Sequence, residues 1–217
     1  MIRFEHVAMA FPARHGRRVL FRDLSLTLPA GSRVGVLGAN GAGKSTLLAL
    51  AAGTLRPTAG RVVAAGMVSW PMGFAGGSAP DMTGRQTARF VARIYGVPTA
   101  EFEAHVAEFA ELGSFLDMPL RTYSTGMRAR LAFAMSTGIA FDWYLVDEIT
   151  AVGDAAFRQK SLAAFRGRLA GAGLLMVSHA MPALREFCTS GLVVGGGSAR
   201  FFADIGEAIA AHSAAVA

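Results

Sequence analysis

One stretch of the chain, Gly38–Ser45, restricts the possible folds more than any other. It reads Gly-Ala-Asn-Gly-Ala-Gly-Lys-Ser, follows a short apolar run at 33–37 and precedes an apolar segment at 46–52. This order predicts a buried strand, a glycine-rich turn and a helix. Glycines let backbone N–H groups converge on an anion without hindrance from a Cβ atom, and the helix N-terminus adds a positive dipole end. The stretch therefore predicts a cradle for the phosphates of a nucleotide.

Two side chains that end this stretch have the chemistry to bind a nucleotide together with Mg²⁺. We expect Lys44 to reach the β- and γ-phosphates and Ser45 to supply a hydroxyl to the metal ion. The nucleotide-binding residues expected in this segment are Gly38, Asn40, Gly41, Ala42, Gly43, Lys44, Ser45 and Thr46. A chance glycine turn before a helix is the alternative, and the surrounding strand and helix patterns make it the weaker one.

A second apolar run, at 141–146, ends in Asp147 and Glu148. A buried strand with two carboxylates at its C-terminal end fits a phosphoryl-transfer site. There Asp147 can hold Mg²⁺, directly or through water, and Glu148 can polarise the attacking water. A solvated strand end is the alternative, since an apolar run before Asp-Glu is common. The position of Asp147 and Glu148 downstream of the cradle favours the functional interpretation.

Two other segments allow both a functional and a structural interpretation. The residues at 123–130 open a predicted helix, and their hydroxyls and glycine could bind phosphate or simply cap that helix. His179 follows a predicted strand at 174–178, where a histidine is more often a hydrogen-bonded core or capping residue than a catalytic one. The residues alone leave both questions open.

Composition describes a globular protein without a disulfide framework. Of the 217 residues, 53% are hydrophobic and 17% charged, and the single cysteine, Cys188, favours a reducing compartment. No Cys/His cluster has metal-site spacing, so Mg²⁺ would enter with the nucleotide. The N-terminal residues lack the layout of a signal peptide, and prolines and glycines in the uncharged run at 62–80 argue against a membrane span.

The formal charge of +6 leaves the meaning of one basic cluster open. The cluster consists of Arg14, His15, Arg17, Arg18 and Arg22. A solvated loop, a membrane face and a nucleic acid all fit such a balance. No basic stripe with interleaved aromatic residues accompanies it, so nucleic acid is the least favoured partner.

The remaining periodicity predicts an α/β protein with a mostly parallel sheet. Predicted strands lie at 2–11, 18–28, 33–37, 61–65, 67–70, 141–146 and 174–178, and a hairpin spans 191–203 around the glycines at 195–197. Predicted helices lie at 46–52, 99–112, 155–169 and 204–211, with others beginning near Thr83 and Thr125. Residues from about 80 to 135 are mainly helical, between β-containing halves. We expect one domain, 1–217, with this segment as a helical subdomain.

Taken in this order, the motifs resemble the nucleotide-binding subunit of ABC transporters from end to end. Gly38–Ser45 matches the Walker A loop and Asp147 the Walker B carboxylate. Glu148 matches the catalytic glutamate, His179 the switch histidine and Phe11 an aromatic residue that stacks on adenine. The resemblance implies the ABC ATPase fold, an α/β P-loop NTPase core with an N-terminal antiparallel β-rich portion and a helical insertion. It implies ATP and Mg²⁺ as ligands.

Two further segments resemble motifs of this family that contain nucleotide-binding residues. They are the signature motif at 123–127, with Ser124 and Gly126, and a D-loop variant at 151–154, with Asp154. Thr125 and Met127 replace the more usual glycine and glutamine. The resemblance implies a homodimer in which the cradle of each copy faces Ser124 and Gly126 of the other.

Segments 68–74, 82–85 and 93–96 narrow the resemblance to the ATPase of capsular polysaccharide exporters. The resemblance implies a peripheral protein at the cytoplasmic face of the inner membrane. Its ATP hydrolysis would drive a separately encoded permease, which handles most of the polysaccharide. Related O-antigen exporters often append a carbohydrate-binding domain, and the end of the chain at Ala217 favours the capsule type.

Three alternative functions remain. One is an exporter of O-antigen or teichoic acid, and another is a soluble ABC-type ATPase that acts on nucleic acid. The latter suits the basic pI but commonly has paired cassettes or a coiled-coil insertion. The third is a regulatory nucleotide binder without activity. It is supported by the missing glutamine that usually contacts Mg²⁺, because Gln86 is better explained as a helix cap and only Gln159 remains.

The apolar segment at 68–82 suggests where a permease would dock. Trp70, Met72 and Phe74 lie between prolines and glycines, and exposed apolar patches tend to mark interfaces. We expect this loop and the helix that follows it to receive the permease. The alternative is that Trp70 and Phe74 fill the core beside the helical insertion.

Overall fold

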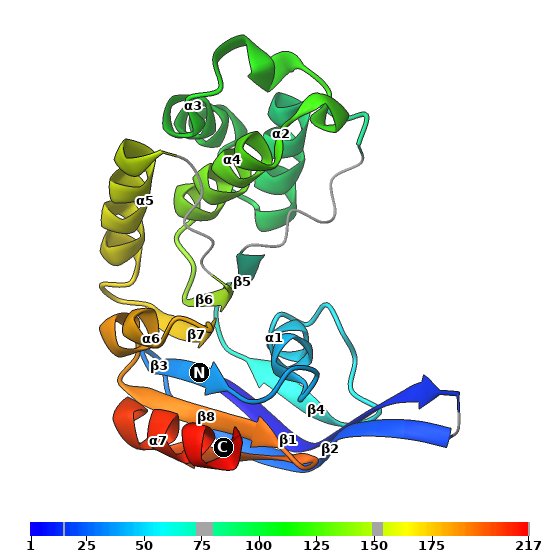
Figure 1. The fold of residues 1–217 in the computed structure, drawn as a ribbon. Helices are drawn as coiled ribbons and strands as arrows, with labels where there is room; N and C mark the ends of the chain where they lie inside the picture. Colours follow the sequence, from blue (N-terminus) through cyan, green and yellow to red (C-terminus); the bar gives the residue numbers. More distant parts are fainter. Residues whose placement is uncertain (15, 73–79, 149–153, 217) are drawn as a thin grey trace. The chain divides into compact units, whose positions relative to one another are not determined.

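The computed structural model describes residues 1–14, 16–72, 80–148 and 154–216, and it divides into two compact units (Figure 1). The sheet unit comprises Met1–Pro71, Phe141–Ile149 and Gly171–Ala217. The helical unit comprises Met72–Ala140 and Thr150–Ala170, so it enters the chain as two insertions. The expected organisation as one domain with a helical subdomain stays a prediction.

The N-terminal part of the sheet unit is an antiparallel sheet with the strand order β2-β1-β4. Its strands are β1 (Ile2–Ala13), β2 (Gly16–Leu28) and β4 (Ala59–Ala64). Ile2, Phe4 and Leu28 are buried, whereas the residues that alternate with them are more exposed. The sheet confirms the expected N-terminal antiparallel portion. Its hairpin is longer than expected, because β2 begins at Gly16 and not at Arg18.

The second sheet of this unit has the strand order β5-β6-β7-β3-β8-β9. Its strands are β3 (Arg33–Leu37), β5 (Val68–Met72), β6 (Trp143–Asp147), β7 (Gly173–Val177), β8 (Ser190–Gly195) and β9 (Ser198–Phe202). Strands β6, β7, β3 and β8 run parallel, and β9 forms an antiparallel hairpin with β8. The α/β class and the C-terminal hairpin are therefore confirmed.

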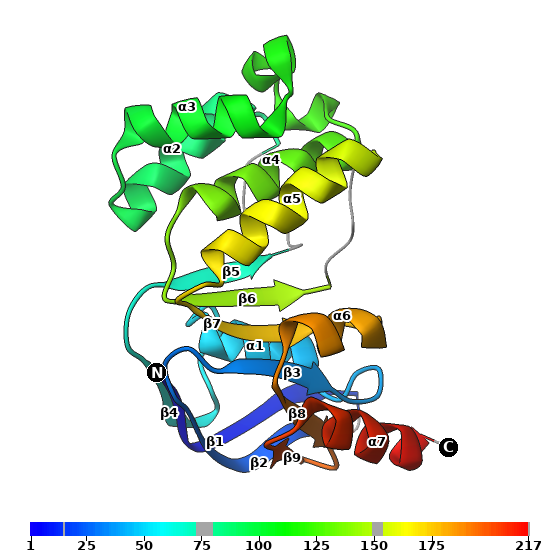
Figure 2. The same ribbon diagram turned by 90° about the vertical axis from the view of Figure 1, so that its left-hand side faces the viewer.

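Helices lie on both faces of this sheet (Figure 2), and the side chains of β3 alternate between the two faces. Val34 and Val36 pack into the core that also contains the leucines of α1 (Lys44–Ala51). On the opposite face, the space above Gly35 is filled by Leu184 of α6 (Met181–Phe187) and Ile205 of α7 (Ile205–Val216). Successive residues of a strand point to opposite faces, so β3 is enclosed on both sides.

Three helices differ from the expectation, while the other boundaries agree within a few residues. Helix α1 begins at Lys44 instead of Thr46, because Gly43 adopts the left-handed conformation at the N-cap, with φ 110°. Helix α7 continues to Val216 instead of ending at Ala211. Helix α6 was not predicted at all, since it is too short for a periodic pattern to stand out.

The helical unit contains α2 (Gly84–Tyr95), α3 (Thr99–Ala110), α4 (Thr125–Gly138) and α5 (Ala155–Arg168). Two 3₁₀ turns, Gly113–Asp117 and Leu120–Thr122, connect α3 to α4. The capping box predicted at the start of α2 is present: the backbone N–H of Gln86 donates to Thr83 Oγ1, and Gln86 Oε1 accepts from the Thr83 N–H. This geometry supports the interpretation of Gln86 as a cap.

Side chains expected to be exposed in the segment at 68–82 are partly enclosed. Trp70 is half-buried and contacts Phe141 edge-to-face, with 5.6 Å between the ring centroids. Met72 is 6% exposed, so the expectation of an exposed Met72 was wrong. Phe74 lies outside the described residues. The predicted docking surface thus receives no support from Trp70 or Met72.

Candidate nucleotide site

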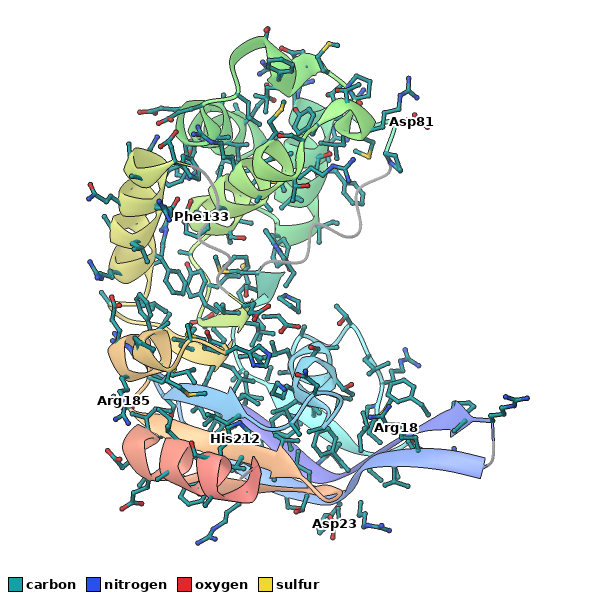
Figure 3. The ribbon with its side chains drawn as sticks, in the orientation of Figure 1. Arg18, Asp23, Asp81, Phe133, Arg185 and His212 are labelled. Atoms are coloured by element: carbon teal, nitrogen blue, oxygen red, sulfur yellow. The ribbon has the colours of Figure 1, made fainter. Side chains whose placement is uncertain are left out.

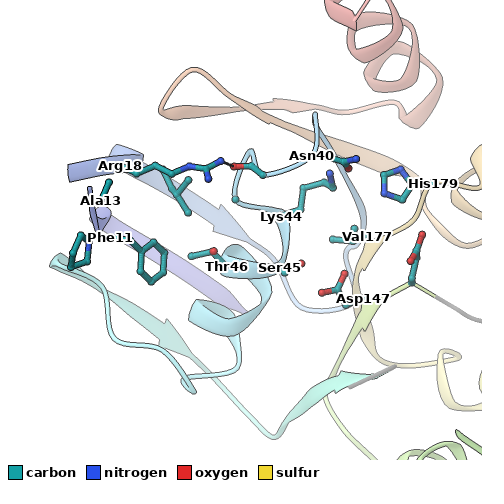
Figure 4. A pocket seen from close by; sticks show the side chains of 15 residues that line it. Phe11, Ala13, Arg18, Asn40, Lys44, Ser45, Thr46, Asp147, Val177 and His179 are labelled. Atoms are coloured by element: carbon teal, nitrogen blue, oxygen red, sulfur yellow. Dashed lines mark hydrogen bonds between the residues drawn. The ribbon is translucent and has the colours of Figure 1, made fainter. Parts of the chain in front are cut away.

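A cavity of about 660 Å³ opens in the sheet unit beside the glycine loop (Figure 4). Residues of three regions line it. The first is the β1–β2 hairpin, with Phe11, Pro12, Ala13, Arg18 and Leu20. The second is the glycine loop and the start of α1, with Asn40, Gly41, Gly43, Lys44, Ser45 and Thr46. The third is the end of β6 and β7, with Asp147, Glu148, Val177 and His179.

The glycine loop wraps around the side chain of Lys44. Lys44 Nζ donates to the carbonyl oxygens of Gly38 at 2.7 Å and Ala39 at 3.0 Å. The side chain is 9% exposed, and its burial lowers the pKa of the ammonium, against the opposing effect of the Asp147 and Glu148 carboxylates. A cation held by two carbonyl groups at the cavity wall is suited to binding an anion. Gly38 itself and Ala42 belong to the loop but are not among the lining residues.

The first turn of α1 presents its free N–H groups to the same cavity. Ser45 and Thr46 lie in this turn, and both line the cavity. No acidic residue occupies the first turn, so nothing there repels a phosphate group. The arrangement fits the predicted anion site, because N-terminal N–H groups and the helix dipole both favour negative charge.

The carboxylates lie where two parallel strands end side by side. Asp147 of β6 pairs in register with Val177 of β7, and the backbone N–H of Glu148 donates to the Val177 carbonyl at 3.0 Å. His179 follows β7 by two residues, so it reaches the same edge of the sheet. Ligands of open α/β sheets bind at the carboxyl ends of the strands, which is where these three side chains meet.

Glu148 has an unusual backbone conformation, with φ 61°. A non-glycine residue in the left-handed region costs free energy, and such residues concentrate at functional sites. Together with its place in the cavity, this conformation supports a functional interpretation of Glu148 over a solvated strand end.

The residues present fit Mg²⁺ only as part of a nucleotide complex. Ser45 and Asp147 both line the cavity and offer a hydroxyl and a carboxylate. Within the described part of the chain, no group of three or more His, Cys, Asp or Glu residues could hold a metal ion by itself. Phosphate oxygens would have to complete the coordination, which agrees with the preference of Mg²⁺ for few protein ligands plus phosphates.

The structure therefore brings most of the predicted site residues together. Those that line the one cavity are Phe11, Asn40, Gly41, Gly43, Lys44, Ser45, Thr46, Asp147, Glu148 and His179. Phe11 is 36% exposed at the end of β1, where its ring is available for stacking.

Apart from Gly38 and Ala42 of the glycine loop, the predicted site residues that do not line the cavity belong to the helical unit. Ser124 caps α4, because its Oγ accepts from the Met127 N–H at 3.2 Å. Gly126 lies in the first turn of this helix. Asp154 caps α5 through the Phe157 N–H at 2.9 Å and also pairs with Arg130. Residues 151–153 of the predicted D-loop lie outside the described part of the chain.

Sequence reasoning missed one charged residue of the cavity. Arg18 belongs to the basic cluster of the hairpin, and its Nη2 donates to the carbonyl of Gly41 at 2.7 Å. The predicted role of Phe11 could have pointed to Arg18. If Phe11 lies at the site, the residue paired with Phe11 on the next strand lies beside the site as well. The pairing register that identifies the partner could not be read from the sequence.

Comparison with known proteins places the chain in a family. A model described as ABC transporter matches residues 21–151. The polysialic acid transport protein KpsT of Escherichia coli is 45% identical over 195 residues, covering 89% of this chain and 87% of that protein. The capsule polysaccharide export protein CtrD of Neisseria meningitidis serogroup B is 39% identical and covers 96% of both chains. The O-antigen export protein RfbB of Klebsiella pneumoniae is 38% identical, covering 84% of this chain and 76% of its own.

Solved structures agree with this assignment at the level of the fold. The ATP-binding subunit of an ABC transporter superposes with a TM-score of 0.80 at 18% identity, covering 98% of this chain and 99% of that structure. A dimeric ATP-binding cassette bound to ADP and Pi superposes with a TM-score of 0.77, covering 93% and 97%. Among the helices of the described residues, none has the length and apolar character needed to cross a bilayer. The chain belongs to the ABC transporter family, as one of its ATP-binding subunits with ATPase activity.

Proposed function

We propose that this ATPase drives the export of a capsular polysaccharide through a separately encoded membrane permease. The ATPase part of this proposal rests on one observation: Lys44, Asp147, Glu148 and His179 line the same cavity. The polysaccharide part rests on relatives named for polysialic acid transport and capsule export, each matched over most of its length. An O-antigen export protein is also similar, so an O-antigen substrate is the alternative.

We assign roles to six side chains of the cavity. Phe11 stacks on the adenine base, and the glycine loop with Lys44 binds the phosphates. Ser45 and Asp147 hold Mg²⁺, which supplies charge neutralisation to the phosphates when bound. Glu148 accepts a proton from the attacking water, and His179 contacts the phosphate that is transferred.

The catalytic unit is a homodimer in this proposal. Ser124, Gly126 and Asp154 of one copy complete the nucleotide site of the other, which gives a function to two helix N-termini that do not line the cavity of their own chain. A solved cassette of similar fold is described as dimeric and bound to ADP and Pi, which supports a dimer. The permease binds the dimer from the membrane side and carries the polysaccharide.

Deletion of the gene in its own organism tests the substrate. Loss of surface capsule, with polysaccharide retained inside the cell and O-antigen still at the surface, supports the proposal. Loss of surface O-antigen with an intact capsule would favour the alternative. Re-expression of the wild-type chain should restore export, while the Glu148→Gln chain should not, and this pair links export to hydrolysis.

A further inference from the structure

Arg18 and Phe11 are direct partners in the pairing of β1 with β2. Partners in an antiparallel pair project from the same face of the sheet, and both side chains line the cavity. The neighbouring pair, Pro12 and Arg17, lies one residue further along, and Arg17 is not among the lining residues. Figure 3 shows Arg18 on this hairpin. This cross-strand pair thus places an aromatic ring and a guanidinium in the nucleotide site.

The loop leaves a specific space for this guanidinium. Arg18 Nη2 donates to the Gly41 carbonyl at 2.7 Å, and a Cβ atom added to Gly41 would lie 2.5 Å from the same nitrogen. Gly41 also has φ 75°, a conformation that favours glycine. A Cβ atom added to Gly43 would lie 3.2 Å from Phe21 and 3.5 Å from Leu20, which are also residues of β2. Side chains of β2 thus lie close to two glycines of the loop.

Most donors of the guanidinium remain for a ligand. An arginine side chain has five N–H donors, and the contact with Gly41 occupies one of them. The ion pairs found in the described residues include none with Arg18. Figure 4 shows Arg18 on the side of Phe11 and Ala13, with Lys44 between it and Asp147. The cavity thus has a cation at its aromatic end and the carboxylates at its other end.

We infer that Arg18 is a further nucleotide-binding residue, which donates to the phosphates nearest the ribose while it stays bound to Gly41. This inference rests on the proposed nucleotide site. A base stacked on Phe11 puts the ribose and its first phosphates beside Arg18, whereas Lys44 lies further toward the carboxylates. Guanidinium and phosphate make strong charge-assisted hydrogen bonds. The contact would also tie the position of the β1–β2 hairpin to nucleotide binding.

Affinity measurements on the purified full-length protein test this assignment. Calorimetric titration with ADP and with GDP in the presence of EDTA avoids hydrolysis. Arg18→Met keeps the apolar stem of the side chain and should weaken both nucleotides by the same factor, about tenfold. Arg18→Lys keeps the charge and should recover most of the loss. Arg18→Gln keeps a hydrogen-bond donor without the charge and should not recover the lost affinity.

Arg17→Met is the matched control, because it removes the same charge from the other face of the strand. It should change the affinities by less than about twofold at physiological salt, where exposed charges are screened. An equal loss in both variants, or a loss for ADP alone, would overturn the phosphate contact. Wild-type affinity in Arg18→Gln would reduce Arg18 to a loop-positioning residue. If Lys44→Ala loses nucleotide affinity and Arg18→Met does not, the role of Arg18 is refuted and the nucleotide site stands. If neither variant loses affinity, the nucleotide site itself is refuted.

Discussion

At the scale of single residues, Lys44 has the most constrained environment in the site. Two backbone carbonyl groups accept from its ammonium group, and the residue is 9% exposed at the wall of the cavity. The burial lowers its pKa, but the carboxylates of Asp147 and Glu148 act in the opposite direction. An ammonium group whose donors are already aligned loses little freedom when it binds a phosphate.

Lys44→Ala should therefore weaken ATP binding by about ten- to hundredfold, the range for one charge-assisted hydrogen bond. It should also abolish measurable phosphate release, because the transferred phosphate loses its cation. Titration calorimetry and a phosphate-release assay measure the two effects. Unchanged turnover in this variant would remove the glycine loop from the proposed site.

Cys188 provides a second test at this scale. It is buried, and burial raises the pKa of its thiol to about 12. Only the thiolate is a good nucleophile, so the thiol should be nearly inert in the folded protein. Ellman's reagent at pH 8 should react with Cys188 slowly in buffer and rapidly in concentrated urea. Rapid reaction in buffer would contradict the burial of this residue.

At the scale of elements, the start of β7 is fitted closely to β6. Gly173 pairs with Trp143 across the two strands, and the tryptophan is fully buried. A Cβ atom added to Gly173 would lie 2.6 Å from the indole ring. The glycine thus leaves room for the indole of Trp143 beside the start of β7.

Gly173→Ala should accordingly destabilise the fold by about 1–3 kcal/mol through overpacking. Gly171→Ala is the matched control, because a Cβ atom there would meet nothing within 4 Å. Urea unfolding followed by circular dichroism and by tryptophan fluorescence compares the two variants. Equal free energies of unfolding in the two variants would mean that the indole of Trp143 moves aside without loss of stability.

The helices of the second unit are also fixed at their ends. Asp154 caps α5 and pairs with Arg130 of α4, while Lys160 of α5 pairs with Glu111 after α3. The guanidinium of Arg130 lies over the ring of Phe157 at 4.3 Å. These contacts hold the start of α5 against α4, the helix that begins within the predicted signature motif at 123–127.

At the scale of the whole molecule, the two units contain complementary parts of the proposed site. The cavity residues belong to the sheet unit, and Ser124, Gly126 and Asp154 belong to the helical unit. In the proposed dimer, each nucleotide joins the sheet unit of one copy to the helical unit of the other. Hydrolysis then separates the copies, which is the movement a permease could follow.

Glu148→Gln should trap this dimer. The substitution keeps the shape of the side chain but removes the proton acceptor, so turnover should fall by about 10²–10⁴-fold while ATP still binds. Size-exclusion chromatography with Mg-ATP should show a dimer for this variant and a monomer for Lys44→Ala. Turnover near the wild-type rate would move the proton acceptor elsewhere, with His179 the next residue to test.

The sequence by itself determined the parts of this protein that depend on local order. The glycine loop between a strand and a helix, the two carboxylates after an apolar run and the capping box at Thr83 each follow from neighbouring residues. Buried strands and amphipathic helices also follow from local periodicity. For that reason, the fold class and most cavity residues could be predicted without a structure.

Only the tertiary structure decided which distant residues meet. The register between β1 and β2 sets Arg18 opposite Phe11 and brings its guanidinium to Gly41, and no local pattern encodes that register. The backbone N–H of Glu148, a residue with a left-handed backbone, donates to β7, a strand far along the chain. The burial of Met72 and the short helix α6 likewise result from packing. Contacts between segments far apart in sequence depend on how the sheet assembles, and a linear pattern does not contain that information.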